Sequence, residues 1–305
     1  MKARRAHGLI DLAVVLRADL ADSRRSWMAG VLILLYLLGS VASSALFVYL
    51  LHQIETQIAA SLEVASANST GAMTARLWEL EPFRHIIREI VGDEALAERL
   101  LRLPPLALFY GWVAITFAPI LVVLTAAGSV ASEIGSGSAR YALVRTSRWR
   151  WCLGKLLGQA SLALIGILLG GAGVWLIGQI FLTGFEPWAS AVGILGFSLR
   201  GWIYSLAFLG LAVGVSQLAR SQYRAWGMVL LAIIALWLLG YGADRLLGAG
   251  WERLGETLRL LTPQHHRLGL WYQDTAHLVP AVVYLATLGG LYFVLGHLLF
   301  VRRDA

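Results

Sequence analysis

Cysteine is almost absent from this chain, in which Cys152 is the single one among 305 residues. A disulfide framework and a metal site built from paired cysteines are therefore excluded. Charge is also scarce, because Asp, Glu, Lys and Arg make up 14% of the residues while 58% are hydrophobic. A soluble domain carries about 25% charged residues. This composition indicates a protein that faces lipid over much of its surface.

The sequence also lacks a loop of the kind that cradles nucleotide phosphates. Gly154-Lys155 is followed by Leu156 where Ser or Thr is needed, and Trp149 stands where the first Gly belongs. His265 and His266 are adjacent, so on a helix they diverge by about 100° and cannot share a metal ion. We therefore expect no catalytic residue, no bound cofactor and no metal, and we do not expect this chain to be an enzyme.

Long apolar runs dominate what is present. About 20 apolar residues in a helix cross the roughly 30 Å hydrocarbon core of a membrane. Six runs meet this length, and they predict an all-α, polytopic membrane protein with one transmembrane domain over residues 1–305. The predicted spans are 27–51, 104–132, 156–183, 195–218, 225–243 and 276–301. The pairs Gly166-xxx-Gly170 and Gly210-xxx-Gly214 permit close helix packing. Arg200 is expected to reach the outer interface or to face a substrate.

Three further segments accompany the spans. Residues 8–25 predict an amphipathic interface helix, because Leu9, Leu12, Leu16 and Leu20 recur at helical spacing opposite Asp11, Asp22 and Arg25. Residues 53–102 hold eight of the 18 acidic residues and predict a small helical extracytoplasmic cap. Within it, Asp93 is expected to cap a helix with a leucine stripe. Residues 249–274 predict an outer interfacial segment.

The distribution of Lys and Arg gives the orientation. Residues 1–26, the loop 133–155, the turn near 220–224 and the last residues hold 15 of the 25 Lys and Arg residues. Cytoplasmic loops carry such an excess, so we expect both termini in the cytoplasm. The pI of about 9.8 is typical of nucleic-acid binders as well. We expect no nucleic-acid partner, because these charges lie at the ends of apolar runs rather than on one polar domain.

The most informative stretch is the basic loop from Glu133 to Lys155. Glu133 ends the second span, since a carboxylate at the membrane centre costs roughly 2.5 to 3.5 kcal/mol. Gly135 and Gly137 permit a sharp turn, and Ser136 or Ser138 can cap a short helix.

Two arginines follow in the same loop. Arg145 and Arg148 are three residues apart and are expected to lie on one helix face. Lys155 begins the third span. From these residues alone, a solvated loop that obeys the orientation rule explains the pattern as well as a docking element does.

The loop also resembles a signature of the permease subunits of type-2 ABC exporters. That signature has a Glu at the end of the second span, a Gly followed by Ser or Thr, a short apolar helix, a Ser-Arg pair and a Gly-Lys pair. The matching residues are Glu133, Gly137-Ser138, Leu143, Ser147-Arg148 and Gly154-Lys155. The family usually has a Pro before the Ser-Arg pair, where this chain has Arg145-Thr146. Weaker matches are Arg17 to Arg25, Thr262-Pro263 with Arg267-Leu268, and Phe300 to Asp304. The nearest branch includes the maturation permease of nitrous oxide reductase.

The resemblance implies a homodimeric permease in the bacterial cytoplasmic (inner) membrane, contacting lipid and bound to a separate ATP-binding cassette ATPase that holds ATP and Mg²⁺. It implies that residues 133–152 form the coupling loop and helix. The implied ATPase-coupling residues are Glu133, Gly137, Ser138, Arg140, Arg145, Arg148 and Lys155. The implied residues of the interface helix are Arg17, Asp22, Arg24 and Arg25.

Two alternatives stay open. The same ATPase could drive a permease that moves no solute and instead acts, through residues 53–102, on an extracytoplasmic partner. An intramembrane enzyme or an ion-driven carrier would place ionisable groups deep in the spans, whereas the deep polar residues here include Gln159, Ser161 and Gln179, all neutral. The cargo itself is open among lipids, peptides, drugs and other amphipathic molecules.

Overall fold

The computed structural model describes residues 14–15, 17–21, 27–61, 93–183 and 185–303. Within these ranges the protein is all-helical, and six of its helices are long and apolar enough to cross a membrane. They are α2 (Trp27–Ser61), α6 (Pro105–Ala126), α9 (Arg148–Phe181), α10 (Pro187–Ser216), α11 (Gln222–Gly248) and α13 (Thr275–Arg303). The predicted polytopic, six-helix fold is confirmed.

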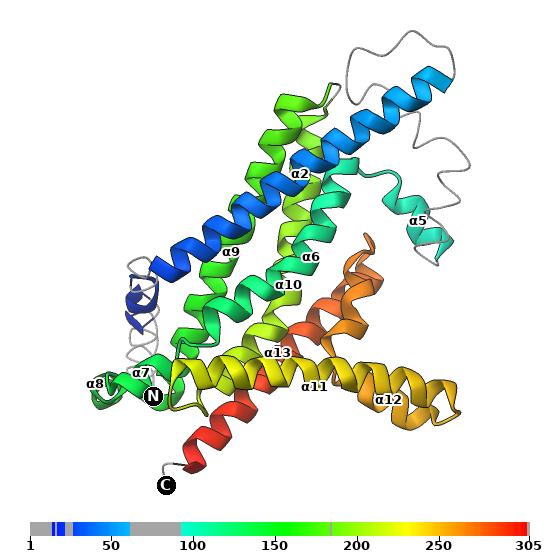
Figure 1. The fold of residues 1–305 in the computed structure, drawn as a ribbon. Coiled ribbons are helices and arrows are strands. Elements are labelled where there is room, and N and C mark those ends of the chain that lie inside the picture. Colours follow the sequence, from blue (N-terminus) through cyan, green and yellow to red (C-terminus); the bar gives the residue numbers. More distant parts are fainter. Residues whose placement is uncertain (1–13, 16, 22–26, 62–92, 184, 304–305) are drawn as a thin grey trace.

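Helix α10 lies at the centre of the bundle and packs against α6, α9, α11 and α13 (Figure 1). Helix α2 packs along α9 and α6 on one side. The contact between α10 and α13 is backbone to backbone, because a Cβ at Gly214 would lie 2.6 Å from the carbonyl oxygen of Tyr292. A Cβ at Gly210 would overlap the carbonyl of Gly289. The close packing predicted from the Gly210-xxx-Gly214 pair is thus confirmed for α10.

Several span limits differ from the predicted ones. Helix α9 begins at Arg148 rather than at 156, since the Ser147 side chain caps it by accepting from the Arg150 N–H at 3.4 Å. Helix α10 begins at Pro187, a residue suited to a first helical turn, rather than at 195. Helix α6 ends at Ala126 rather than at 132, and α2 continues past residue 51 to Ser61. Hydropathy located the six candidate spans, whereas the Ser147 cap and Pro187 mark the starts of α9 and α10.

Short helices occupy both ends of the bundle (Figure 1). We call the basic end the one formed by residues 14–15 and 17–21, by α7 (Ala131–Ser136) and α8 (Ala139–Arg145), by the turn 217–221 and by the last turn of α13. The opposite end carries α5 (Glu94–Leu100), α12 (Glu252–Leu260) and η1 (Pro263–Leu270). Of the interface helix predicted over 8–25, the described residues are helical and the remainder lies outside the described ranges.

Candidate functional site

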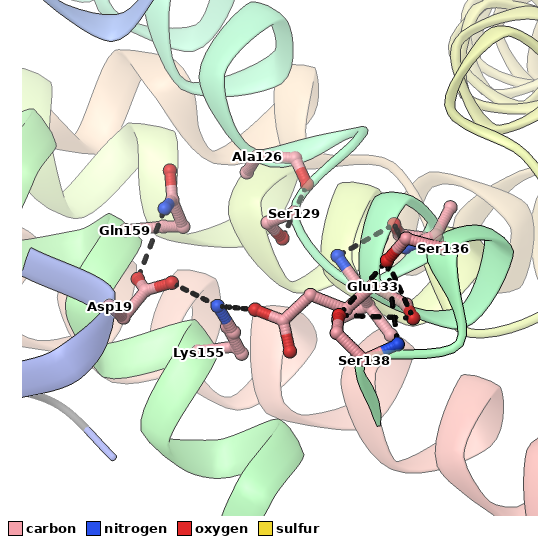
Figure 2. Close-up of polar contacts among 11 residues, drawn as sticks. Asp19, Ala126, Ser129, Glu133, Ser136, Ser138, Lys155 and Gln159 are labelled. Carbon is pink, nitrogen blue, oxygen red and sulfur yellow. Dashed lines mark hydrogen bonds and ion pairs between the residues drawn. The ribbon is translucent and has the colours of Figure 1, made fainter. Parts of the chain in front are cut away.

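The corner between α7 and α8 is made by one glycine. Gly137 ends α7 with φ 77° and ψ −3°, a left-handed conformation that suits a residue without a Cβ. Its N–H donates to the Ile134 carbonyl at 3.2 Å. Ser136 Oγ and Ser138 Oγ lie 2.9 Å apart beside the Glu133 carbonyl (Figure 2). Ser138 occupies the N-cap position of α8, but its side chain makes no cap hydrogen bond to the helix.

Helix α8 has a packed face and an exposed face. Ala139 is buried, and Ala142 and Leu143 pack against the main hydrophobic core. On the other side, Tyr141 is 81% and Val144 is 85% exposed, and the neighbouring Arg140 and Arg145 are exposed as well. Large apolar side chains surrounded by arginine are typical of a protein-binding surface. We call these four residues the α8 face.

Arg145 and Arg148 do not share a helix face, so that prediction was wrong. Helix α8 ends at Arg145, Thr146 is extended (φ −137°, ψ 155°), and Arg148 is the first residue of α9. The guanidinium of Arg148 lies 5.5 Å from the centre of the Phe300 ring, near the end of α13. A spacing of three residues brings side chains together only within one uninterrupted helix.

Lys155 lies between two carboxylates from different parts of the chain (Figure 2). Its Nζ is 2.6 Å from Asp19 Oδ1 in the N-terminal helical residues, and it also forms an ion pair with Glu133 of α7. Gln159, one turn further along α9, donates from Nε2 to Asp19 Oδ2 at 3.1 Å. Asp19 and Lys155 are buried, whereas Glu133 is partly exposed. We call Asp19, Glu133 and Lys155 the carboxylate–lysine cluster. It joins three helical elements at the basic end.

Asp19 was missed by the sequence analysis, although the sequence held a signal for it. It falls at helical spacing with Leu12 and Leu16, on the apolar side of the predicted interface helix. A carboxylate in that position must find a partner. Gly158 makes the approach sterically possible, because a Cβ at that position would overlap Asp19 Oδ2.

Helix α7 also contacts the end of α10 and the turn before α11. Ser216 Oγ, at the end of α10, accepts from the backbone N–H groups of Val130 and Ala131 at 3.3 and 3.0 Å. A Cβ at Gly135 would lie 2.9 Å from the Arg220 carbonyl oxygen. Helix α7, which Gly137 joins to α8, therefore contacts the end of α10, the α10–α11 turn and Lys155 of α9.

The remaining predicted residues are distributed as follows. Arg17 is exposed near Asp19, while Asp22, Arg24 and Arg25 lie outside the described residues. Arg200 places its guanidinium 5.0 Å from the centre of the Phe197 ring. Within the described ranges, no three or more His, Cys, Asp or Glu side chains are grouped to hold a metal ion.

A second polar cluster lies at the opposite end. Asp93 caps α5 by accepting from the N–H groups of Ala95 and Leu96 at 2.9 and 3.2 Å, as predicted, and it also accepts from the Tyr272 hydroxyl. The hydrogen bond from Tyr272 lowers the pKa of Asp93.

The residues before α13 complete this cluster. Arg99 of α5 pairs with Asp274, whose other partner is His277, with 2.8 Å between Nδ1 and Oδ1. The His277 hydrogen bond is the main cause that lowers the pKa of Asp274 to about 2. We call Asp93, Arg99, Tyr272, Asp274 and His277 the α5–α13 cluster, because they join α5 to the residues just before α13.

Comparison with known proteins gives one match. The family model described as ABC-2 family transporter protein matches residues 13–305, which is nearly the whole chain. No curated protein matches the sequence significantly.

Proposed function

The chain belongs to the ABC-2 family of transporter proteins, and from this premise we propose that it is the permease of an ATP-driven exporter, coupled to a separate ATPase subunit. As a member of this family with six candidate spans, it is an integral membrane component of an ABC transporter. In our proposal two copies form the pathway in a bacterial inner membrane. The basic end faces the cytoplasm, and cargo moves outward from the cytoplasm or the inner leaflet.

The α8 face is the single observation that carries the coupling proposal. Tyr141 and Val144 are the two most exposed apolar side chains of the loop between α6 and α9, and arginines flank them. Within this loop, α8 lies at the basic end and outside the six candidate spans (Figure 1). An ATPase cleft that accepts this helix would bury both side chains and pair the arginines with its own acidic groups.

Because its sequence has no phosphate-cradling loop, the chain in our proposal does not itself hydrolyse nucleotide. In our proposal the partner therefore holds ATP and Mg²⁺. Closure of the partner on ATP would push α8, and the carboxylate–lysine cluster would pass the displacement from α7 to α9. Of the predicted coupling residues, Arg140 and Arg145 would touch the partner, while the buried Lys155 would act from inside by holding α7 to α9.

Co-purification of the ATPase tests this proposal, with a second exposed tyrosine as the control position. The wild-type chain is expected to bring down an ATP-binding cassette subunit from its own cell membranes. Tyr141→Ala together with Val144→Asp should lose that subunit while the permease still inserts. Tyr223→Ala is the control, because Tyr223 is 88% exposed and lies at the start of α11, outside the α8 face. Retention of the subunit by the double variant contradicts the proposal.

A further inference from the structure

Two adjoining hollows are lined by α2 and α6, and the one nearer the basic end also by residues of α7, α9 and α11. The one nearer the basic end has a volume of about 320 Å³ and is lined by the carboxylate–lysine cluster together with Thr125, Ser129, Gln159 and Gln222. The other, deeper along the spans, has a volume of about 290 Å³ and is lined mainly by apolar side chains. Leu32 and Leu124 line both. The two hollows therefore adjoin, and we call them together the α2–α6 groove.

The polar part of the groove favours a cation that can donate hydrogen bonds. Its described lining contains two carboxylates, Asp19 and Glu133, against one ammonium group, Lys155. The Gln159 side chain is 4% exposed; its Nε2 is used by Asp19, and its Oε1 has no hydrogen-bond partner. A buried acceptor left without a donor is destabilising. A bound N–H group would supply the missing donor.

The apolar part of the groove suits a hydrocarbon chain. Its walls are formed by Leu35 of α2 and by Val113, Phe117 and Ile120 of α6, and it lies within the part of both helices that is long enough to cross the membrane. Gly39 leaves room there, since a Cβ at that position would meet no atom within 4 Å.

Together these features point to one class of ligand. We propose that the α2–α6 groove binds an amphiphile with an N–H-bearing ammonium head and an apolar chain, entering from the basic end. The proposal rests on the permease function above and names the substrate class of that permease. Aminolipids and amphipathic amines share this chemistry. Quaternary ammonium compounds lack the N–H group, and anionic amphiphiles would meet the excess carboxylate.

Photolabelling tests the proposal on the full chain in phosphatidylglycerol nanodiscs, alone and with its ATPase. The probe is dodecylamine with a diazirine near the end of its chain, and labelled peptides are mapped by mass spectrometry. Label is expected on the groove walls of α2 and α6. Unlabelled dodecylamine should prevent it, dodecyltrimethylammonium should compete about tenfold more weakly because one charged hydrogen bond is lost, and dodecyl sulfate should not compete. Equal competition by all three overturns the proposal.

A second experiment adds phosphatidylethanolamine to the nanodisc and so distinguishes an aminolipid ligand from a free amine. If the groove binds aminolipids, this lipid should occupy it and labelling should be lost; if the groove binds free amines, labelling should persist.

Two matched pairs of variants locate the site. Gly39→Leu should reduce labelling about tenfold by filling the groove, whereas Gly30→Leu, at an equally open position on the same helix outside the groove, should not. Gln159→Leu should lose the preference for dodecylamine, whereas Gln179→Leu, an exposed position on the same helix, should keep it.

The outcomes separate this inference from the proposed function. A complex that binds its ATPase but shows no selective labelling overturns only the ligand class. Selective labelling of a chain that binds no ATPase overturns the proposed coupling to an ATPase and leaves the ligand class standing. The variant Ser43→Cys tests whether the groove is instead the contact between two copies of the chain. A disulfide between two copies at this position, together with loss of labelling, would overturn the ligand proposal.

Discussion

Lys155 Nζ lies 2.6 Å from Asp19 Oδ1 across 136 positions of sequence, and both side chains are buried. This contact ties the N-terminal helical residues to α9, and the ion pair of the same lysine with Glu133 adds α7. Removal of Lys155 alone leaves the buried Asp19 carboxylate without its cation. Removal of Asp19 as well leaves only the partly exposed Glu133 without it, which costs less.

A double-mutant cycle should therefore be strongly non-additive. We expect Lys155→Met to lower the free energy of unfolding by about 3 to 5 kcal/mol, as for other broken buried ion pairs. Addition of Asp19→Asn should restore part of that loss. Thermal unfolding in detergent measures the effect. The control is Arg259→Met, which breaks the more exposed pair with Asp244 and should cost about 0 to 1 kcal/mol. If the effects of the Asp19 and Lys155 substitutions on the free energy of unfolding simply add, the two side chains do not interact as the structure shows.

Gly158→Ala should release Asp19 without altering any charge. The added Cβ would overlap Asp19 Oδ2, so we expect faster backbone hydrogen exchange in residues 17–21. Gly227→Ala is the control, because a Cβ there meets no atom within 4 Å. Unchanged exchange in the Gly158 variant would mean that the two helices are not held at this contact.

Gly137→Ala should impair coupling beyond its effect on stability. A side chain in the left-handed region costs about 1 to 2 kcal/mol, and here the strain falls on the corner that sets the angle of α8. We expect less stimulation of the partner ATPase. Gly250→Ala supplies the comparison, since Gly250 has a similar φ of 85° but lies at the opposite end. Equal ATPase stimulation in both variants would show that the α7–α8 angle has no role.

Acid should weaken the α5–α13 cluster. The pKa of Asp274 falls from 3.8 to about 2 on folding, so its stabilising contribution is complete above pH 3.8 and is lost as the pH falls towards 2. The lowered pKa of Asp93 acts in the same direction. Proteolysis or hydrogen exchange of α5 should increase over this range. Asp274→Asn should raise exchange already at neutral pH and flatten its pH dependence. A profile identical to that of the wild type would show that Asp274 does not hold α5 in place.

The candidate membrane spans could be predicted from the sequence, but the contacts between the helices could not. Hydropathy located all six spans because lipid demands apolar length, and Asp93 was recognised as a cap because its preference is local. The start of α9 was placed late, since Arg148, Arg150 and Lys155 make its first turns polar. Lys155 finds its partners through tertiary packing, and no local pattern revealed that Asp19 would be one of them.

Site-directed cross-linking tests the central claim most directly. Cys152 is buried, so Val144→Cys introduces a far more accessible thiol on the α8 face, and Trp251→Cys does the same beside α12 at the opposite end. A thiol-to-amine cross-linker applied to the assembled transporter should join the permease to its ATPase through position 144 and not through position 251. Cross-linking through 251 alone would place the ATPase at the other end of the bundle and contradict the account.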